Sequence, residues 1–333
     1  MRGLALCLAL LLSATLPVRA EGEPAAYSIQ VRAVPLAEQE DGLATLQQLK
    51  DRGYLVYGYR AEIDGSAWLR IAVGAFQSRG AAAEYGLAFS AAEGMEHFVA
   101  AAPVLILPGA GERDFVVTPS ALWVRGGDSA REVFVFDATA PNESGLPAMV
   151  RPTLSPDWSA LAFVDRGQVH AAHLNGDRAI PLHDRGSPVV EADAEFPWHI
   201  GWSPSSRYVA FLDQPFWEHP IGLWLARADG TELRCLFCAG SYGARWFLWH
   251  PTEDRVLFVK ASAHGHSQYG GTLISVDPDG AMAPVAAAAV DRRQEFVGPL
   301  RIEDGQLHFR LFHYDDSYQK EAETRESLPI DAL

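Results

Sequence analysis

The sequence predicts two folded units in one chain, an α+β unit followed by an all-β repeat unit. Residues 27–106 alternate between strand-like and helix-like patterns in the order βαββαβ. Beyond them no amphipathic helix is convincing, and a segment with a proline turn and an apolar strand recurs every 47 or 48 residues. We therefore expect a multidomain protein whose repeat unit is built from strands alone.

The first 20 residues, "MRGLALCLALLLSATLPVRA", have the composition of a secretory signal peptide. A basic residue precedes a short apolar run, and small residues lead to a cleavage position after Ala20. Cys7 follows Leu6, not a small residue, and so makes a poor lipid attachment site. No other segment approaches the roughly 20 apolar residues of a membrane span. We expect export to the periplasm and no membrane insertion after cleavage.

The charge of the chain excludes two classes of partner. Its 42 acidic residues outnumber its 27 Lys and Arg residues, which gives a net charge of −15. Removal of the leader takes away Arg2 and Arg19 but no acid, so the net charge becomes −17. Binding to nucleic acid or to anionic lipid needs clustered Lys and Arg. Neither is therefore an expected partner.

The α+β unit is predicted to have a ferredoxin-like arrangement. A strand at 27–34 precedes a helix at 37–53 that ends at Gly53, and Asp64-Gly65 marks the turn of a strand hairpin. An Ala-rich helix at about 78–92 and a strand within 94–107 complete the unit. In this arrangement both helices cover one face of the sheet, the first and third strands are central neighbours, and the other face stays open.

The open face carries the candidate binding residues. Strand alternation places Ser28 and Ala72 there together with amide, guanidinium and aromatic side chains. The candidates are Gln30, Arg32, Tyr57, Tyr59, Trp68 and Arg70. An indole can stack on a sugar ring while amide and guanidinium groups bond hydroxyls and carboxylates. The alternative is that this face packs against the second unit and buries Trp68. RNA recognition, which uses a similar sheet, does not fit an exported acidic chain.

The repeat unit is predicted to be a β-propeller. Three segments share a proline turn and then a Phe seven residues later: "TLSPDWSALAFVD" (153–165), "GWSPSSRYVAFLD" (201–213) and "LWHPTEDRVLFVK" (248–260). Pro299 marks a weaker fourth copy. A period of about 45 residues made of four short strands is typical of a propeller blade. Residues 107–114 are interpreted as a linker and residues 115–333 as about five blades, with tryptophans such as Trp158 packed between them.

Two families are similar to these segments. Residues 27–106 resemble the SPOR (sporulation-related repeat) domain through "YSIQV" and "WLRIAVGAF", although Arg32 and Ala33 depart from its usual first strand. That resemblance implies binding of peptidoglycan glycan strands stripped of stem peptides, with Gln30, Trp68 and Arg70 at the contact positions. The segments "SPDWSALAFV" and "WSPSSRYVAFL" look like blades of TolB-type propellers, which are periplasmic interaction platforms. Fold alone does not fix the function of a propeller.

Other chemistry is predicted to be absent. Cys235 and Cys238 are expected to form a local disulfide or to pack as thiols, with redox or metal chemistry as the weaker alternative. The pairs His264/His266 and His170/His173 could each supply two zinc ligands, but no third ligand lies at a telling spacing. We find no G-x-S-x-G, H-E-x-x-H or phosphate-loop motif. The sequence therefore predicts no cofactor, no metal and no catalytic residues.

The functional expectation has a main form and an alternative. The main form is a non-enzymatic exported protein that binds peptidoglycan through its first unit and an envelope protein through its propeller, in cell division or envelope maintenance. The alternative is a periplasmic enzyme or small-ligand receptor built on the propeller, with the first unit as a targeting module.

Overall fold

The structure is a computed structural model, and it describes most of the chain after residue 25. The described residues are 26–127, 129–136, 150–165, 168–183, 198–213, 221–238, 240, 242–262, 270–290 and 293–333. The predicted signal peptide and the pair His264/His266 lie outside them. Within these ranges the protein consists of many small antiparallel sheets and two α-helices. No helix of the described residues is long and apolar enough to cross a membrane.

The N-terminal unit follows the order βαββαβ. Its elements are β1 (Ala26–Pro35), a 3-10 turn (Leu36–Glu38), α1 (Gln39–Asp51), β2 (Val56–Ile63), β3 (Ser66–Phe76), α2 (Arg79–Glu93) and β4 (Phe98–Ala102). The strands form one antiparallel sheet of order β2-β3-β1-β4, so β1 and β3 are central neighbours. Both helices pack on one face, over a core that includes Ile29, Leu49, Ile71 and Phe89.

Local sequence accounts for the ends of these elements. Asp64 and Gly65 both have positive φ, 50° and 76°, which matches the two-residue turn predicted for the β2–β3 hairpin. The Ser78 side chain accepts a hydrogen bond from the backbone N–H of Ala81 and so caps the start of α2. Gly94 ends α2 in the left-handed conformation, with φ 66°.

The boundary between the two units differs from the prediction. The segment 94–107 is split by Pro103 into β4, which joins the N-terminal sheet, and β5 (Leu105–Pro108), which joins the next one. Proline lacks a backbone N–H and fixes φ, so it interrupts a strand at this point. Residues 107–114 are not a linker: they contain the end of β5, the turn after it and the start of β6 (Arg113–Val117).

Five further sheets follow, and each is an antiparallel meander. The first contains β5, β6, β7 (Ala121–Gly126) and β8 (Ser129–Val135), and the second β9 (Val150–Leu154), β10 (Ala160–Asp165), β11 (Gln168–His173) and β12 (Ile180–His183). The third contains β13 (Trp198–Trp202), β14 (Tyr208–Asp213), β15 (Gly222–Arg227) and β16 (Leu233–Phe237). The fourth contains β17 (Tyr242–Trp249), β18 (Val256–Ser262), β19 (Gly271–Val276) and β20 (Met282–Val290). The last contains β21 (Gln294–Glu303), β22 (Gln306–Tyr314) and β23 (Lys320–Pro329), and a 3-10 turn (Ile330–Ala332) comes after it.

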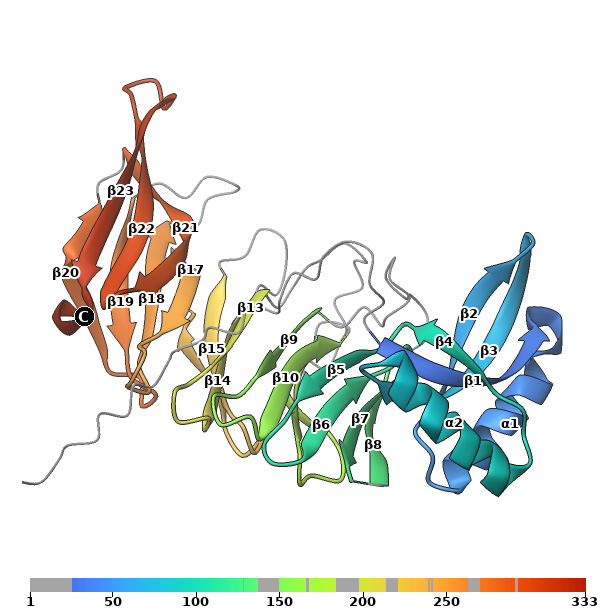
Figure 1. Cartoon of the computed structure of the whole chain (residues 1–333). Helices are drawn as coiled ribbons and strands as arrows, with labels where there is room; N and C mark the ends of the chain where they lie inside the picture. The colour runs from blue at the N-terminus through green and yellow to red at the C-terminus, as the bar shows by residue number, and fades with distance from the viewer. Residues whose placement is uncertain are drawn as a thin grey trace, which may run out of the picture.

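Successive sheets lie in a row, and the N-terminal unit stands at one end of it (Figure 1). One hydrophobic cluster fills each gap between neighbouring sheets, from the pair β5–β8 and β9–β12 to the pair β17–β20 and β21–β23. Among the described residues, none of these clusters joins the last sheet to the first. A further cluster joins the N-terminal sheet to the sheet β5–β8, so the N-terminal sheet extends the row.

The repeated phenylalanines lie in the core as their spacing predicts. Phe163, Phe211 and Phe258 are all fully buried between sheets. Pro299 does not mark an equivalent turn, because it lies inside strand β21. Trp158 is also an exception: its side chain is 43% exposed in a turn where its φ is 62°, so it does not pack between blades.

Two tryptophans make the same bond one repeat apart. The indole of Trp202 donates to the Thr153 carbonyl at 2.8 Å, and that of Trp249 donates to the Gly201 carbonyl at 2.9 Å. Each bond joins a sheet to the preceding one. We expect Trp249→Phe to lower the free energy of unfolding by about 1–2 kcal/mol, because it removes a donor and leaves the Gly201 carbonyl unpaired. Urea denaturation tests this, and an unchanged midpoint would contradict it.

The proline turns are also bonded to each other through a carboxylate. Asp254 accepts from the Ser205 backbone N–H (3.1 Å), the Ser205 hydroxyl (2.6 Å) and Arg207 (2.9 Å). Partial burial by itself would raise the pKa of Asp254, but these hydrogen bonds outweigh it and hold the pKa below its ordinary value.

A depressed pKa in the folded state makes this turn acid-sensitive. The stability that Asp254 contributes is present above the pKa of the carboxyl in the unfolded chain and is lost as the pH falls through its folded pKa. We expect Asp254→Asn to lower the free energy of unfolding by about 1 kcal/mol at pH 7, a small effect because the turn is solvated. The difference from the wild type should shrink as the pH approaches 3, as measured by denaturation across pH. A difference that stays constant with pH would show that the charge has no part in it.

Candidate glycan-binding face

The sheet face opposite the helices is covered over part of its length. Near the start of β1 and the end of β4, the residues Ala26, Tyr57, Ala72 and Ala102 pack against Trp123 and its neighbours in the sheet β5–β8. Salt bridges extend this contact: Lys50 pairs with Glu132 at 2.7 Å, and Arg125, which pairs with Asp114 at 2.5 Å, also donates to the Ala75 carbonyl. The alternative in which this face meets the second unit is therefore correct for this end of the sheet.

Tyr57 belongs to the covered part. Its side chain is fully buried, and Ser28, also buried, donates to the Gly74 carbonyl at 2.7 Å. Since the Ser28 hydroxyl has only one hydrogen, the Tyr57 hydroxyl donates to it. Burial raises the pKa of Tyr57 above its ordinary value. A ligand has no access to this side chain, so the prediction of Tyr57 as a binding residue is wrong.

Arg32 lies on the other face of the sheet. The pairing of β1 with β3 shifts register between Gln30 and Arg32, which marks a bulge, and beyond it Arg32 is opposite Ile71 of the helix-side core. Its guanidinium donates to Thr45 of α1 at 2.8 Å and lies 3.8 Å from the Asp41 carboxylate. The prediction that Arg32 shares a face with Trp68 is wrong, because the bulge reverses the alternation.

The rest of the face extends past the contact with the sheet β5–β8. Trp68, Arg70, Tyr59 and Gln30 are all partly exposed, and the β2–β3 hairpin projects beyond the neighbouring sheet (Figure 1). Tyr59 is directly opposite Arg70 in the pairing of β2 with β3, so the two side chains share this face. Four of the six candidate residues therefore share this face, and Tyr59 lies at the border of its covered part, because it also packs against the cluster that includes the sheet β5–β8.

Arg70 has an unusual donor. Its Nε is buried and has no hydrogen-bond partner within the described part of the chain. Buried polar atoms in proteins are nearly always hydrogen-bonded, and an exception calls for a ligand or water. Arg70 as a whole is partly exposed, and strand alternation places it on the same face as Trp68.

Phe98 is a residue of this face that the sequence reasoning missed. It is directly opposite Gln30 in the pairing of β4 with β1, so the two lie on the same face, and 62% of its side chain is exposed. An exposed Phe beside an amide provides a second apolar contact for a ligand. The alternation of "HFVAAA" could have identified it, because Phe98 has the same parity as Ala102, which is buried on this face.

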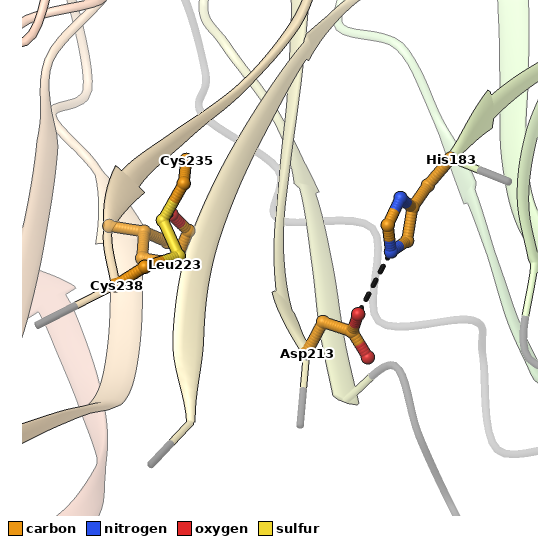
Figure 2. The surroundings of a disulfide bond; sticks show 5 residues. All are labelled: His183, Asp213, Leu223, Cys235 and Cys238. Carbon is orange, nitrogen blue, oxygen red and sulfur yellow. Dashed lines mark hydrogen bonds and ion pairs between the residues drawn. A yellow bond between two sulfur atoms is a disulfide. The ribbon is translucent and has the colours of Figure 1, made fainter. Parts of the chain in front are cut away.

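The cysteines form a disulfide. Cys235 of β16 is bonded to Cys238, which comes after the strand, so the local disulfide is the correct alternative. Figure 2 shows this bond together with a buried pair, in which His183 of β12 lies 2.9 Å from the carboxylate of Asp213 of β14. His183 and Asp213 are 6% and 2% exposed and connect the second sheet to the third.

The predicted histidine pair in β11 does not form a metal site. The ring of His170 packs against those of Phe134 and Phe163, whereas the Nε2 of His173 donates to the Ala228 carbonyl at 2.8 Å. Within the described ranges no group of three or more His, Cys, Asp or Glu side chains is arranged to hold a metal ion.

Comparisons with known proteins give matches at the level of structure. No protein-family model and no curated protein matches the sequence. The tricorn protease is 9% identical over 67% of this chain and 21% of its own, with a TM-score of 0.42. Porphyromonas gingivalis dipeptidyl peptidase 4 is 11% identical over 66% of this chain and 37% of its own, with a TM-score of 0.39. A TolB-type protein from Agrobacterium tumefaciens is 14% identical over 79% of this chain and 89% of its own, with a TM-score of 0.33.

These matches bear on the prediction that the chain is not an enzyme. Their similarity to the chain is one of fold. The similar structures also include a prolyl endopeptidase and an oligogalacturonate lyase, and these enzymes contradict the prediction that the chain is not an enzyme, which is withdrawn. The chain spans less than two thirds of the length of the tricorn protease, the dipeptidyl peptidase and the lyase. What the chain has in common with the TolB-type and peptidase proteins is a series of small antiparallel sheets of the β-propeller type.

Proposed function

We propose that this is a periplasmic protein that the N-terminal unit targets to peptidoglycan, and whose row of sheets acts on or binds a small ligand. The observation that carries the targeting role is the uncovered end of the N-terminal sheet. There Trp68 and Arg70 lie on the part of the face that the sheet β5–β8 leaves accessible.

The side chains of this uncovered face suit a glycan strand without peptides. Trp68 and Phe98 offer apolar ring surfaces for the C–H faces of sugar rings. Gln30 can bond N-acetyl groups, and the partly exposed Arg70 can bond hydroxyls and lactyl carboxylates. The resemblance of residues 27–106 to SPOR domains supports the same ligand. Arg32 and Tyr57 have no part in the proposal.

Co-sedimentation with purified sacculi tests the targeting role. The mature chain, from residue 21, is mixed with intact sacculi and with sacculi whose stem peptides have been removed by an amidase. We expect the chain to sediment with both and to be retained more strongly by the stripped material. Equal recovery in the supernatant with and without sacculi would refute glycan binding.

The role of the sheets is proposed separately, because it rests on other features. A row of sheets of the propeller type presents loops at one edge and open sheet surface at its far end, and either can bind a small molecule. An enzyme or a small-ligand receptor built on these sheets is the first candidate. A platform for another envelope protein is the second candidate, and capture of a specific envelope protein by the sheets alone would favour it.

A further inference from the structure

The last sheet contains a groove with a concentration of cationic side chains. The groove has a volume of about 460 Å³, and Arg301, His308, Arg310 and Arg325 line it together with Glu303, Glu326 and Phe309. The last sheet lies at the opposite end of the row from the N-terminal unit (Figure 1). A groove of this size can take a small organic molecule.

Strand pairing places the three arginines and His308 on one face. Arg301 of β21 is opposite His308 of β22, and Arg310 of β22 is opposite Arg325 of β23. The alternate residues Leu307, Phe309 and Leu311 are buried in the cluster against the fourth sheet, so the cations face away from that sheet. Outside its own sheet β21 contacts β17 and β19 of the fourth sheet, which are on the buried side.

The cations are poorly neutralised by the protein itself. Arg310 pairs with Glu323 at 3.1 Å, but neither Arg301 nor Arg325 forms an ion pair with a described residue. The chain has 42 acidic residues for 27 Lys and Arg residues, so carboxylates are abundant. Like charges directly opposite each other on a sheet, such as Arg310 and Arg325, destabilise it. An anion bound between them would remove that repulsion.

We propose that this groove binds a small organic anion with two or more carboxylate or phosphate groups. Arginine guanidinium groups bond both kinds of group with two parallel N–H donors, and His308 adds a further nitrogen. Glu303, on the same face as Arg301, accepts a hydrogen bond from a hydroxyl group of the ligand. This inference rests on the small-ligand role proposed for the sheets and assigns it a site and a ligand class.

Calorimetric titration of the mature chain with citrate and with pyrophosphate, at low ionic strength, tests the proposal. Citrate presents several carboxylates and pyrophosphate presents two linked phosphate groups, so the two titrations show which kind of group the groove prefers. Arg301→Gln and Arg325→Gln should each weaken binding of the preferred probe at least tenfold. Glu303→Gln should tighten it, because a repulsive charge is removed. Arg79→Gln is the matched control, since Arg79 is an exposed arginine of α2 far from the groove in the sequence.

The outcomes are distinguishable. The proposal is overturned if the wild type binds neither probe, if the two groove variants bind as the wild type does, if Arg79→Gln loses as much affinity as they do, or if Glu303→Gln weakens binding. Circular dichroism of each variant confirms that it folds. Sedimentation of the same samples with sacculi reports the targeting role independently, so loss of anion binding with normal retention concerns the groove alone.

Discussion

Trp68→Ala should weaken binding of the mature chain to peptide-stripped glycan by roughly 30-fold, which corresponds to about 2 kcal/mol. The indole is partly exposed on the accessible part of the sheet and supplies the largest ring surface there. Its loss removes stacking area without opening the core, because Trp68 belongs to neither cluster of the N-terminal sheet. Calorimetric titration with soluble glycan chains measures the change.

Trp158→Ala is the matched control for this experiment. Trp158 is also an exposed tryptophan, at 43%, but it lies in a turn after β9 and outside the N-terminal unit. Its removal should leave glycan affinity within about twofold of the wild type. If Trp68→Ala and Trp158→Ala bind equally well, the indole of Trp68 has no role in glycan binding. Arg70→Lys tests the guanidinium group separately, because lysine keeps the positive charge but lacks the planar set of donors.

Phe211→Ala should have the largest effect on stability, a loss of about 3–5 kcal/mol in the free energy of unfolding. Phe211 is fully buried in the cluster between the second and third sheets, and its ring lies 5.3 Å from that of His183. Removal of the ring leaves a cavity in the middle of the row, where neighbouring sheets depend on each other. Urea denaturation followed by tryptophan fluorescence measures the loss.

Phe98→Ala is the control of the same type for stability. Phe98 is 62% exposed, so its removal should change the free energy of unfolding by no more than about 0.5 kcal/mol. If Phe211→Ala lowers the free energy of unfolding as little as Phe98→Ala does, the hydrophobic cluster between the second and third sheets contributes little to stability. Hydrogen exchange of β10 and β14 would then show where the stability lies.

The sequence was sufficient for the order of elements in both units. Asp64-Gly65 is a specific hairpin signal, Gly53 follows the end of a helix as predicted, and the recurrence of Phe163, Phe211 and Phe258 follows from a repeated buried position. These features act through local backbone conformation or through a period, and both can be read without knowing the tertiary contacts.

The details that decide the binding face depend on contacts that are distant in sequence. The bulge after Gln30 arises from pairing with β3 and turns Arg32 toward α1. The contact of Tyr57 with the sheet β5–β8 depends on how the two units pack. One clue was present: Ala72 and Ala102, small residues on this face, are suited to close approach of a second sheet. The groove of the last sheet likewise needs the register that puts Arg310 opposite Arg325.

Hydrogen–deuterium exchange in the presence of peptide-stripped glycan chains tests the central claim most directly, because it locates the bound ligand. Protection is predicted in β3 around Trp68 and Arg70 and in the adjoining part of β1 around Gln30. The helices α1 and α2 and the sheet β5–β8 should exchange as they do without ligand. Protection confined to those helices or to the row of sheets, with β3 unchanged, would contradict a glycan site on the uncovered end of the N-terminal sheet.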